Sequence, residues 1–179
     1  MFRKTASHAL FLLLNVCIAC QAYASQPQTW GRVNMTGSII ETACAIDVAS
    51  RDQTVEIGTL PLSHIARDGQ GSTLAFSIKL VNCILAKNYN SLPDWHRFQL
   101  TFEGDEDSGS FSMKGDAQGI ALQIVDGSGN VVKPGTQLPV VEIVPDEMRL
   151  NYFLRLVSNN QLLRVGEYSS TVKFKMDYH

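Results

Sequence analysis

The sequence predicts an all-β domain, a sandwich of immunoglobulin type, and three observations support this. Apolar and polar residues alternate with a period of two in several separate segments, which is typical of strands with one buried face. Glycine, proline and asparagine residues bound these segments and supply the backbone conformations that turns require. No long segment has helical periodicity, and only a short helical turn is expected near residues 62–67. Strands of this length and number are typical of a sandwich.

The chain begins with the features of a secretory signal peptide. Arg3 and Lys4 precede an apolar run over residues 10–19, which is too short to cross a bilayer. Residues 22–24, Ala-Tyr-Ala, form a cleavage site of the small-x-small type. We therefore expect residues 1–24 to be removed when the protein is exported.

The composition of the mature chain favours a protein partner. Its length of 155 residues, the total of 179 less the 24 of the signal, suits a single domain with its own core. Without Arg3 and Lys4 the basic residues fall from 15 to 13 against 17 acidic ones, so the net charge is −4. This balance argues against nucleic acid and anionic membranes as partners, and the lack of a second long apolar run argues against stable membrane insertion.

Cys44 and Cys83 are the two cysteines of the mature chain. In an oxidising compartment such a pair most simply forms one structural disulfide. The alternative is a metal or redox pair, which would need close spacing or nearby histidines. The two cysteines are 39 residues apart and have no histidine close by in the sequence.

The expected core strands follow one another between residues 74 and 156. Their apolar faces are Leu74, Phe76, Ile78 and Leu80; Phe98, Leu100 and Phe102; Ile120, Leu122 and Ile124; and Leu150, Tyr152, Leu154 and Leu156. The polar stretch 86–94 between the first two strands is expected to be a surface loop. Because each face alternates with polar residues, each strand should cover the core with one side only.

The last fourteen residues, 166–179, contain the most regular alternation in the chain. Its apolar side consists of Tyr168, Val172, Phe174, Met176 and Tyr178. A strand at a free chain end frays unless something holds it on both sides. We therefore expect this strand to be bound by another segment.

A second, shorter alternation lies near the mature N-terminus. Gly31, Val33 and Met35 fall on one side of an extended segment, and Arg32, Asn34 and Thr36 fall on the other. The segment has no obvious place in the core of its own domain. It is a plausible donor strand for a neighbouring molecule, whereas the simpler alternative is a disordered tail beside a self-contained sandwich.

These features together resemble the pilus subunits of the chaperone–usher pathway. The resemblance rests on the pattern G-x-V-x-M-x-G at 31–37, the cysteine pair, Gly166 at the fourteenth position from the end and the penultimate Tyr178. It covers essentially all of residues 25–179. It implies a signal peptide over 1–24, a donor-strand extension over 25–37 and a pilin domain over 38–179.

The resemblance also implies how such a subunit assembles. A pilin resembles an immunoglobulin sandwich that lacks its last strand, so that one groove exposes the core. A periplasmic chaperone first fills the groove, and the extension of a neighbouring pilin later replaces it at an outer-membrane usher, which is β-augmentation. Implied groove-edge residues are Gly166, Tyr168, Val172, Phe174, Met176 and Tyr178, and the implied plug is Gly31, Val33 and Met35. The expected location is the cell-surface fimbrium, reached through the periplasm.

The stretch from residue 102 to residue 156 resembles most the minor subunit that terminates and anchors P-type pili. It contains G-x-A-x-G-I-x-L-Q-I at 115–124 and L-x-Y-x-L-R-x-V at 150–157. A terminator plugs a neighbour while its own groove refuses another donor strand. An ordinary shaft or adaptor pilin is the alternative, and a carbohydrate-binding tip adhesin is a more distant one.

Enzymatic and metal chemistry have little support in the sequence. His64 and His96 are the internal histidines of the mature chain, and each falls in an expected turn or loop. The acidic stretch 105–110 is similar to a calcium loop but has Gly109 at a ligand position and Ser110 in place of the required glycine. We expect a solvated turn there, no catalysis, no cofactor and no metal.

Overall fold

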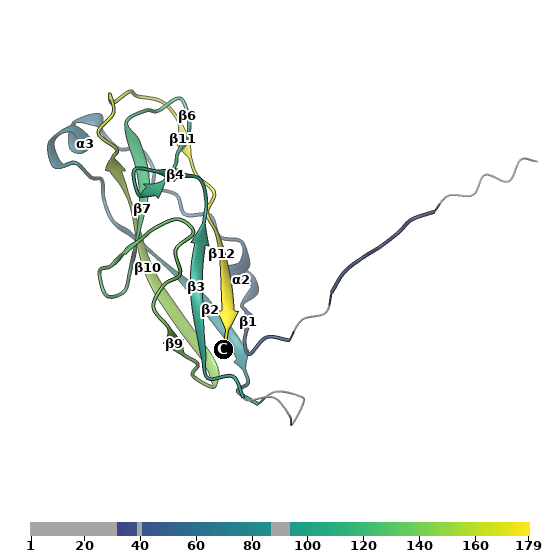
Figure 1. The fold of residues 1–179 in the computed structure, drawn as a ribbon. Helices are drawn as coiled ribbons and strands as arrows, with labels where there is room; N and C mark the ends of the chain where they lie inside the picture. Colours follow the sequence, from purple (N-terminus) through teal and green to yellow (C-terminus); the bar gives the residue numbers. More distant parts are fainter. Residues whose placement is uncertain (1–31, 39–40, 87–93) are drawn as a thin grey trace, which may run out of the picture. The chain divides into compact units, whose positions relative to one another are not determined.

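The computed structural model describes residues 32–38, 41–86 and 94–179, which belong to two separate units, Met1–Ile39 and Ile40–His179 (Figure 1). In the first unit, residues 32–38 contain neither helix nor strand, and all of them are exposed. Most of the loop expected over 86–94 lies outside the described residues. The fold is therefore that of the second unit.

The second unit is built mainly from β-strands. Its elements in chain order are β1 (Ala45–Ile46), α2 (Val48–Arg51), α3 (Leu62–Asp68), β2 (Leu74–Cys83), β3 (Arg97–Glu103), β4 (Glu106–Asp107), β5 (Ser110–Phe111), β6 (Lys114–Gly115), β7 (Ile120–Asp126), β8 (Val131–Val132), β9 (Val141–Glu142), β10 (Asp146–Ser158), β11 (Tyr168–Ser169) and β12 (Lys173–Tyr178). This order confirms the all-β prediction. The four alternating core segments named above form β2, β3, β7 and β10.

The strands form two main sheets and one small one, and every pairing is antiparallel. The larger sheet has seven strands in the order β1-β2-β10-β7-β5-β4, with β8 paired to β7. The second sheet has the order β12-β3-β9, and β11 pairs with β6 alone. Long β10 lies between β2 and β7 and so forms the middle of the larger sheet.

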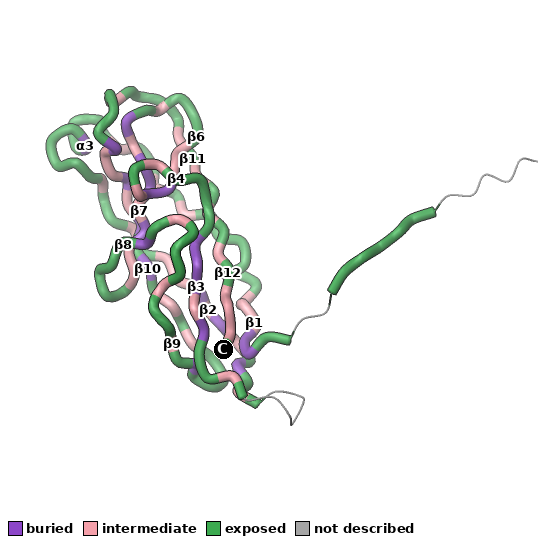
Figure 2. Tube along the Cα trace, in the orientation of Figure 1, coloured by how far each residue is buried: buried purple, intermediate pink, exposed green. Residues whose placement is uncertain are grey.

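The core lies between the two main sheets. Phe102 of β3 contacts Phe76 of β2 and Tyr152 of β10, with ring centroids 6.3 and 5.0 Å apart. Phe98 and Leu100 of β3 are also buried in this cluster. Burial therefore concentrates in the central strands, as Figure 2 shows, because the apolar faces that alternate in the sequence all point between the sheets.

The two helices are short and lie in the same connection. α3 begins one residue after Pro61 and ends at Gly69, which has a left-handed φ of 68°, and this confirms the helical turn expected there. α2 was not predicted. It has four residues, too few to show a helical period, and it begins where the Asp47 side chain accepts a hydrogen bond from the Ala49 amide at 3.0 Å.

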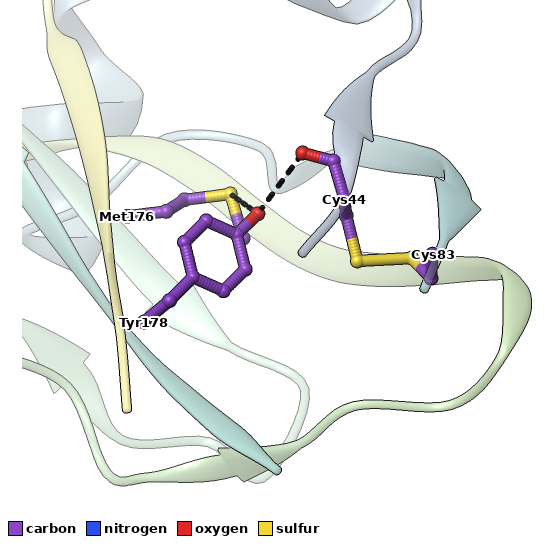
Figure 3. The surroundings of a disulfide bond; sticks show 4 residues. All are labelled: Cys44, Cys83, Met176 and Tyr178. Atoms are coloured by element: carbon purple, nitrogen blue, oxygen red, sulfur yellow. Dashed lines mark hydrogen bonds between the residues drawn. A yellow bond between two sulfur atoms is a disulfide. The ribbon is translucent and has the colours of Figure 1, made fainter. Parts of the chain in front are cut away.

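Cys44 and Cys83 form the predicted disulfide (Figure 3). Cys83 ends β2, and Cys44 immediately precedes β1, which pairs with β2. The cross-link therefore fastens the first residues of the body to the end of a central strand. Closing a loop of 39 residues stabilises the fold by about 3–4 kcal/mol in the chain-entropy model.

We predict that Tyr152 titrates unusually late. Burial, with a smaller effect of the Asp126 carboxylate, raises the pKa of Tyr152 to about 12, against about 10 in an unfolded chain. The neutral phenol therefore stabilises the fold fully below pH ~10, and this stabilisation is lost as the pH rises through about 12. In an ultraviolet titration of tyrosinate, Tyr152→Phe should lack the latest step. Loss of a step near the ordinary tyrosine pKa of about 10 instead of the latest step would contradict the burial that the fold assigns to Tyr152.

Candidate functional site

An open apolar groove lies beside β12. Its volume is about 1010 Å³, and its two banks are residues 50–60 and residues 163–172, the latter continued by Phe174. The floor is made by apolar side chains of both main sheets: Phe76, Ile78, Phe102, Leu122, Ile124, Leu154 and Leu156. Folded interiors seldom contain voids much larger than a water molecule. A hollow of this size that reaches core side chains leaves the interior of the sandwich open on one side.

The groove borders an edge of β12 beside which the described part of the chain places no strand. β12 pairs with β3 through six registered residues, from Lys173 opposite Glu103 to Tyr178 opposite Phe98. Across the groove, residues 53–61 have no assigned secondary structure. Within the described residues, no main-chain hydrogen bond joins 53–61 to β12. The free edge therefore presents unpaired amide and carbonyl groups next to apolar side chains, which is the arrangement that accepts an added strand.

The groove brings together most of the C-terminal residues singled out in the sequence. Gly166, Tyr168, Val172 and Phe174 all line it. Val172 and Phe174 are half-buried and also contact the core cluster. Each side chain therefore packs against the core with one part and lines the groove with another.

Met176 and Tyr178 lie further along β12, outside the residues that line the groove. The Tyr178 hydroxyl donates to the Cys44 carbonyl at 3.4 Å and lies 3.8 Å from the Met176 sulfur (Figure 3). Its ring contacts Trp95 and Phe98, each with centroids 5.9 Å apart. Burial raises the pKa of Tyr178, and the hydrogen bond to Cys44 opposes that rise. The aromatic cluster therefore closes the disulfide end of the sandwich.

Toward the other end of the groove, one hydrogen bond among the described residues connects the two banks. The Tyr168 hydroxyl donates to the Gly58 carbonyl at 2.6 Å. Burial raises the pKa of Tyr168, so the phenol stays neutral and can donate at physiological pH. The bridge occupies a backbone acceptor on the 50–60 bank.

Gly166 is required by a close approach of two backbones. A Cβ atom at this position would lie 2.5 Å from the Ala117 nitrogen and from the Asp116 carbonyl carbon. The main chain around it is held there by hydrogen bonds from Asp116 and Ala117 to the Glu167 carbonyl, at 3.0 and 3.1 Å. A side chain at Gly166 would therefore displace the bank that carries Tyr168.

The N-terminal segment presents apolar side chains to solvent. Val33 is 87% exposed and Met35 is 89% exposed. Gly31, the third residue of the expected plug, lies outside the described residues. Two large, exposed apolar side chains that alternate with polar ones are available to another surface.

Sequence reasoning missed the bank formed by residues 50–60. Val55 and Ile57 are half-buried and pack against the core cluster, whereas Thr54 and Glu56 between and beside them are exposed. The signal was a two-residue alternation, Val55-Glu56-Ile57, which is too short to separate from chance. This segment borders the groove because β12, across the groove from it, is the edge strand of its sheet.

The acidic stretch and the histidines considered in the sequence analysis form no metal-binding cluster in the described residues. The acidic stretch 105–110 forms a tight hairpin in which β4 pairs with β5 and both Ser108 and Gly109 have positive φ, as expected for a turn. His64 and His96 are exposed. Over residues 32–38, 41–86 and 94–179, no group of three or more His, Cys, Asp or Glu side chains could hold a metal ion. The described helices are also too short and polar to span a bilayer.

Comparison with known proteins identifies the family. A family model described as "Fimbrial protein" matches residues 33–179. The chain belongs to the fimbrial protein family. The PRS and PAP fimbrial minor pilin proteins of Escherichia coli are each 30% identical to it over 160 residues, which cover 87% of this chain and 82% of theirs.

Solved structures agree with this fimbrial family. The P pilus rod subunit PapA has a TM-score of 0.66 and 21% identity, with 77% of this chain and 100% of that chain covered. A chaperone–usher pilus structure has a TM-score of 0.66 and 22% identity, with 87% and 99% covered. The fold is the immunoglobulin-like fold of pilins. This fimbrial protein is thus a structural pilin subunit of cell-surface fimbriae and not an enzyme.

We predict that Gly166→Ala destabilises this pilin by roughly 1–3 kcal/mol, the usual cost of overpacking, because the added methyl group would overlap backbone atoms. The matched control is Gly127→Ala, where the new Cβ would meet the Asn151 oxygen at an ordinary 3.5 Å. Urea denaturation of the two variants, purified in the same state, measures the difference. Equal urea midpoints for the two variants would contradict the prediction, because they would show that the backbone near Ala117 moves aside at no cost in stability.

Proposed function

We propose that this pilin is a minor structural subunit of a chaperone–usher fimbria and is joined to its neighbours by donor-strand exchange. The observation that supports this best is the groove of about 1010 Å³, which borders the unpaired edge of β12 and has core side chains as its floor. An inserted strand would supply what such a groove lacks, namely backbone partners for the edge and apolar side chains for the floor.

The energetics favour a strand over a small ligand as the occupant. Burial of an apolar side chain contributes about 1.5–3 kcal/mol, so four or five of them contribute on the order of 10 kcal/mol before the cost of ordering the strand. Main-chain hydrogen bonds along the edge add to this. Because the floor combines side chains from β2, β3, β7 and β10, an empty groove would also expose the chain to aggregation.

In this proposal the mature chain begins at Ser25, after the signal peptide, and residues 25–37 are the extension that enters a neighbour's groove. Val33 and Met35 would be its anchors, since both are exposed in their own chain. Gly31 would complete the plug. A periplasmic chaperone would occupy the groove of residues 38–179 during export, and an outer-membrane usher would be the place of exchange.

We predict that Phe174→Asp abolishes co-purification with the periplasmic chaperone and leads to degradation or aggregation. The reason is that it places an unpaired charge among the apolar side chains of the groove. Lys173→Asp is the matched control, because Lys173 precedes Phe174 in β12 but is exposed. It should cost at most about 1 kcal/mol through its position opposite Glu103. Normal chaperone binding by Phe174→Asp would refute the groove as the binding site.

A second candidate function is that of the base terminator, which donates its extension but refuses a donor strand. Two observations support it. The two minor pilins cited above are 30% identical to this chain over most of its length. The Tyr168–Gly58 hydrogen bond joins the banks of the groove at one end and would oppose the entry of a strand there. The alternative is an ordinary shaft or adaptor subunit.

We predict that the chaperone-bound protein exchanges only slowly with a synthetic peptide donor, and that Tyr168→Phe exchanges faster. Loss of one hydrogen bond of about 1 kcal/mol corresponds to roughly a fivefold change in rate if the bridge must open first. Native gel electrophoresis over time measures both rates. Rapid exchange by the unmodified protein would identify an ordinary link in the fibre.

A sugar-binding tip role has less support. Trp30 lies outside the described residues, and the Trp95 ring is half-buried against Tyr178. Trp95 therefore contributes to the closed end of the sandwich and does not offer a free face on which a sugar ring could stack.

A further inference from the structure

Two apolar side chains outside the groove are exposed at the end of the body that carries Ala43, where the N-terminal extension joins it. Ile84 is 63% exposed and Val144 is 54% exposed. Cys83 lies opposite Asp146 in the β2–β10 ladder, so Ile84, which follows Cys83, and Val144, which precedes Asp146, come from adjacent chain ends. We call Ile84 and Val144 the donor-end surface.

This surface lies where the extension joins the body. The Ile84 amide donates to the Ala43 carbonyl at 2.8 Å, and Ala43 is the first buried residue of the body. Ser38, the last described residue of the extension, is connected to Ala43 by the four residues 39–42. Five residue steps span at most about 18 Å. When the extension is seated in another subunit, Ile84 must therefore lie close to the end of that subunit's groove.

The direction of insertion decides which end of the receiving groove this is. Every strand pair in the described body is antiparallel. Antiparallel addition beside β12 continues that pattern and gives the better hydrogen-bond geometry. The donor's body then lies beyond the beginning of the receiver's β12, not beyond its C-terminus.

In this chain, the corresponding end of the groove has an apolar rim. Leu62 and Val165 line the groove and are exposed, and Leu162, three residues before Val165 in the chain, is 88% exposed. Scattered exposed apolar residues are ordinary, but these continue the apolar lining of the groove past the bridge from Tyr168 to Gly58. A receiving pilin of the same fold with a similar rim would present that rim where the donor's body comes to rest.

We propose that the donor-end surface docks on the apolar rim at the groove end of the pilin that receives the extension. This inference rests on donor-strand exchange as proposed above, and it adds a contact between the two bodies. The occupant is the body of the receiving pilin. The contact holds whether or not this subunit is a terminator, because a terminator also donates its extension. It limits how the two bodies can bend about the short connection 39–42.

Photo-crosslinking in intact fimbriae tests the proposal. A photoreactive amino acid replaces Ile84 or Val144 in the bacterium that makes this protein, and fimbriae are isolated after irradiation. We expect an adduct that is larger by the mass of one pilin, and mass spectrometry should locate the cross-link at the groove end of that pilin. Val131 is the matched control, because it is an equally ordinary exposed valine in β8. It pairs with Val125, whose partner Phe153 lies seven residues beyond Asp146 along β10, on the order of 23 Å away.

A second position separates failure of this inference from failure of donor-strand exchange. The same photoreactive residue at Asn34, on the polar side of the extension, should cross-link to the receiving pilin. Cross-linking from Asn34 without any pilin adduct from Ile84 or Val144 would overturn the body contact and leave donor-strand exchange standing. An adduct to a protein other than a pilin would also overturn it. Absence of cross-links from all three positions would refute both proposals.

Dissociation of the fimbriae gives an independent measurement. The double variant Ile84→Asp, Val144→Asp keeps the extension intact but places two charges on the donor-end surface. We expect it to leave the fimbria at a lower temperature in detergent than the unmodified subunit. Val131→Asp should dissociate as the unmodified subunit does. Equal dissociation temperatures for all three proteins would contradict the body contact.

Discussion

The unpaired edge of β12 is the constraint on which the rest of this structure depends. β12 has a complete ladder with β3 on one side, and on the other side it borders a groove whose floor is the core itself. Backbone groups at such an edge need partners, and apolar side chains at such a floor need cover. One added strand, as proposed above, would meet both needs. In that proposal, the groove is one half of an interface between two subunits.

The two ends of the body are held together by different interactions. At the disulfide end, Tyr178 fills the space between Cys44 and Trp95, and the covalent bond to Cys83 holds the first buried residues in place. These contacts and the disulfide hold this end of the body together. At the other end, the banks are joined by the hydroxyl of Tyr168 alone among the hydrogen bonds described there. In the proposed exchange, a strand that enters at this end would have to break this hydrogen bond.

The strands of the core could be recognised from the sequence, and so could the disulfide. Phe98, Leu100 and Phe102 alternate with polar residues and are all buried in β3. Residues 50–60 could not be recognised as a bank of the groove, because only Val55 and Ile57 carry the alternating pattern. The sequence shows that position 166 is a glycine, but it does not show which atoms exclude a side chain there. They belong to Asp116 and Ala117, fifty residues earlier in the chain.

The sequence by itself determined which residues face a core, because a period of two is a local property of an extended backbone. Only the tertiary structure decided which edge of the sheets stays open and which segments border it. The groove is formed by segments that are more than one hundred residues apart, from Gly58 to Tyr168. Their distance across it depends on how two sheets pack, and this is a property of the assembled core.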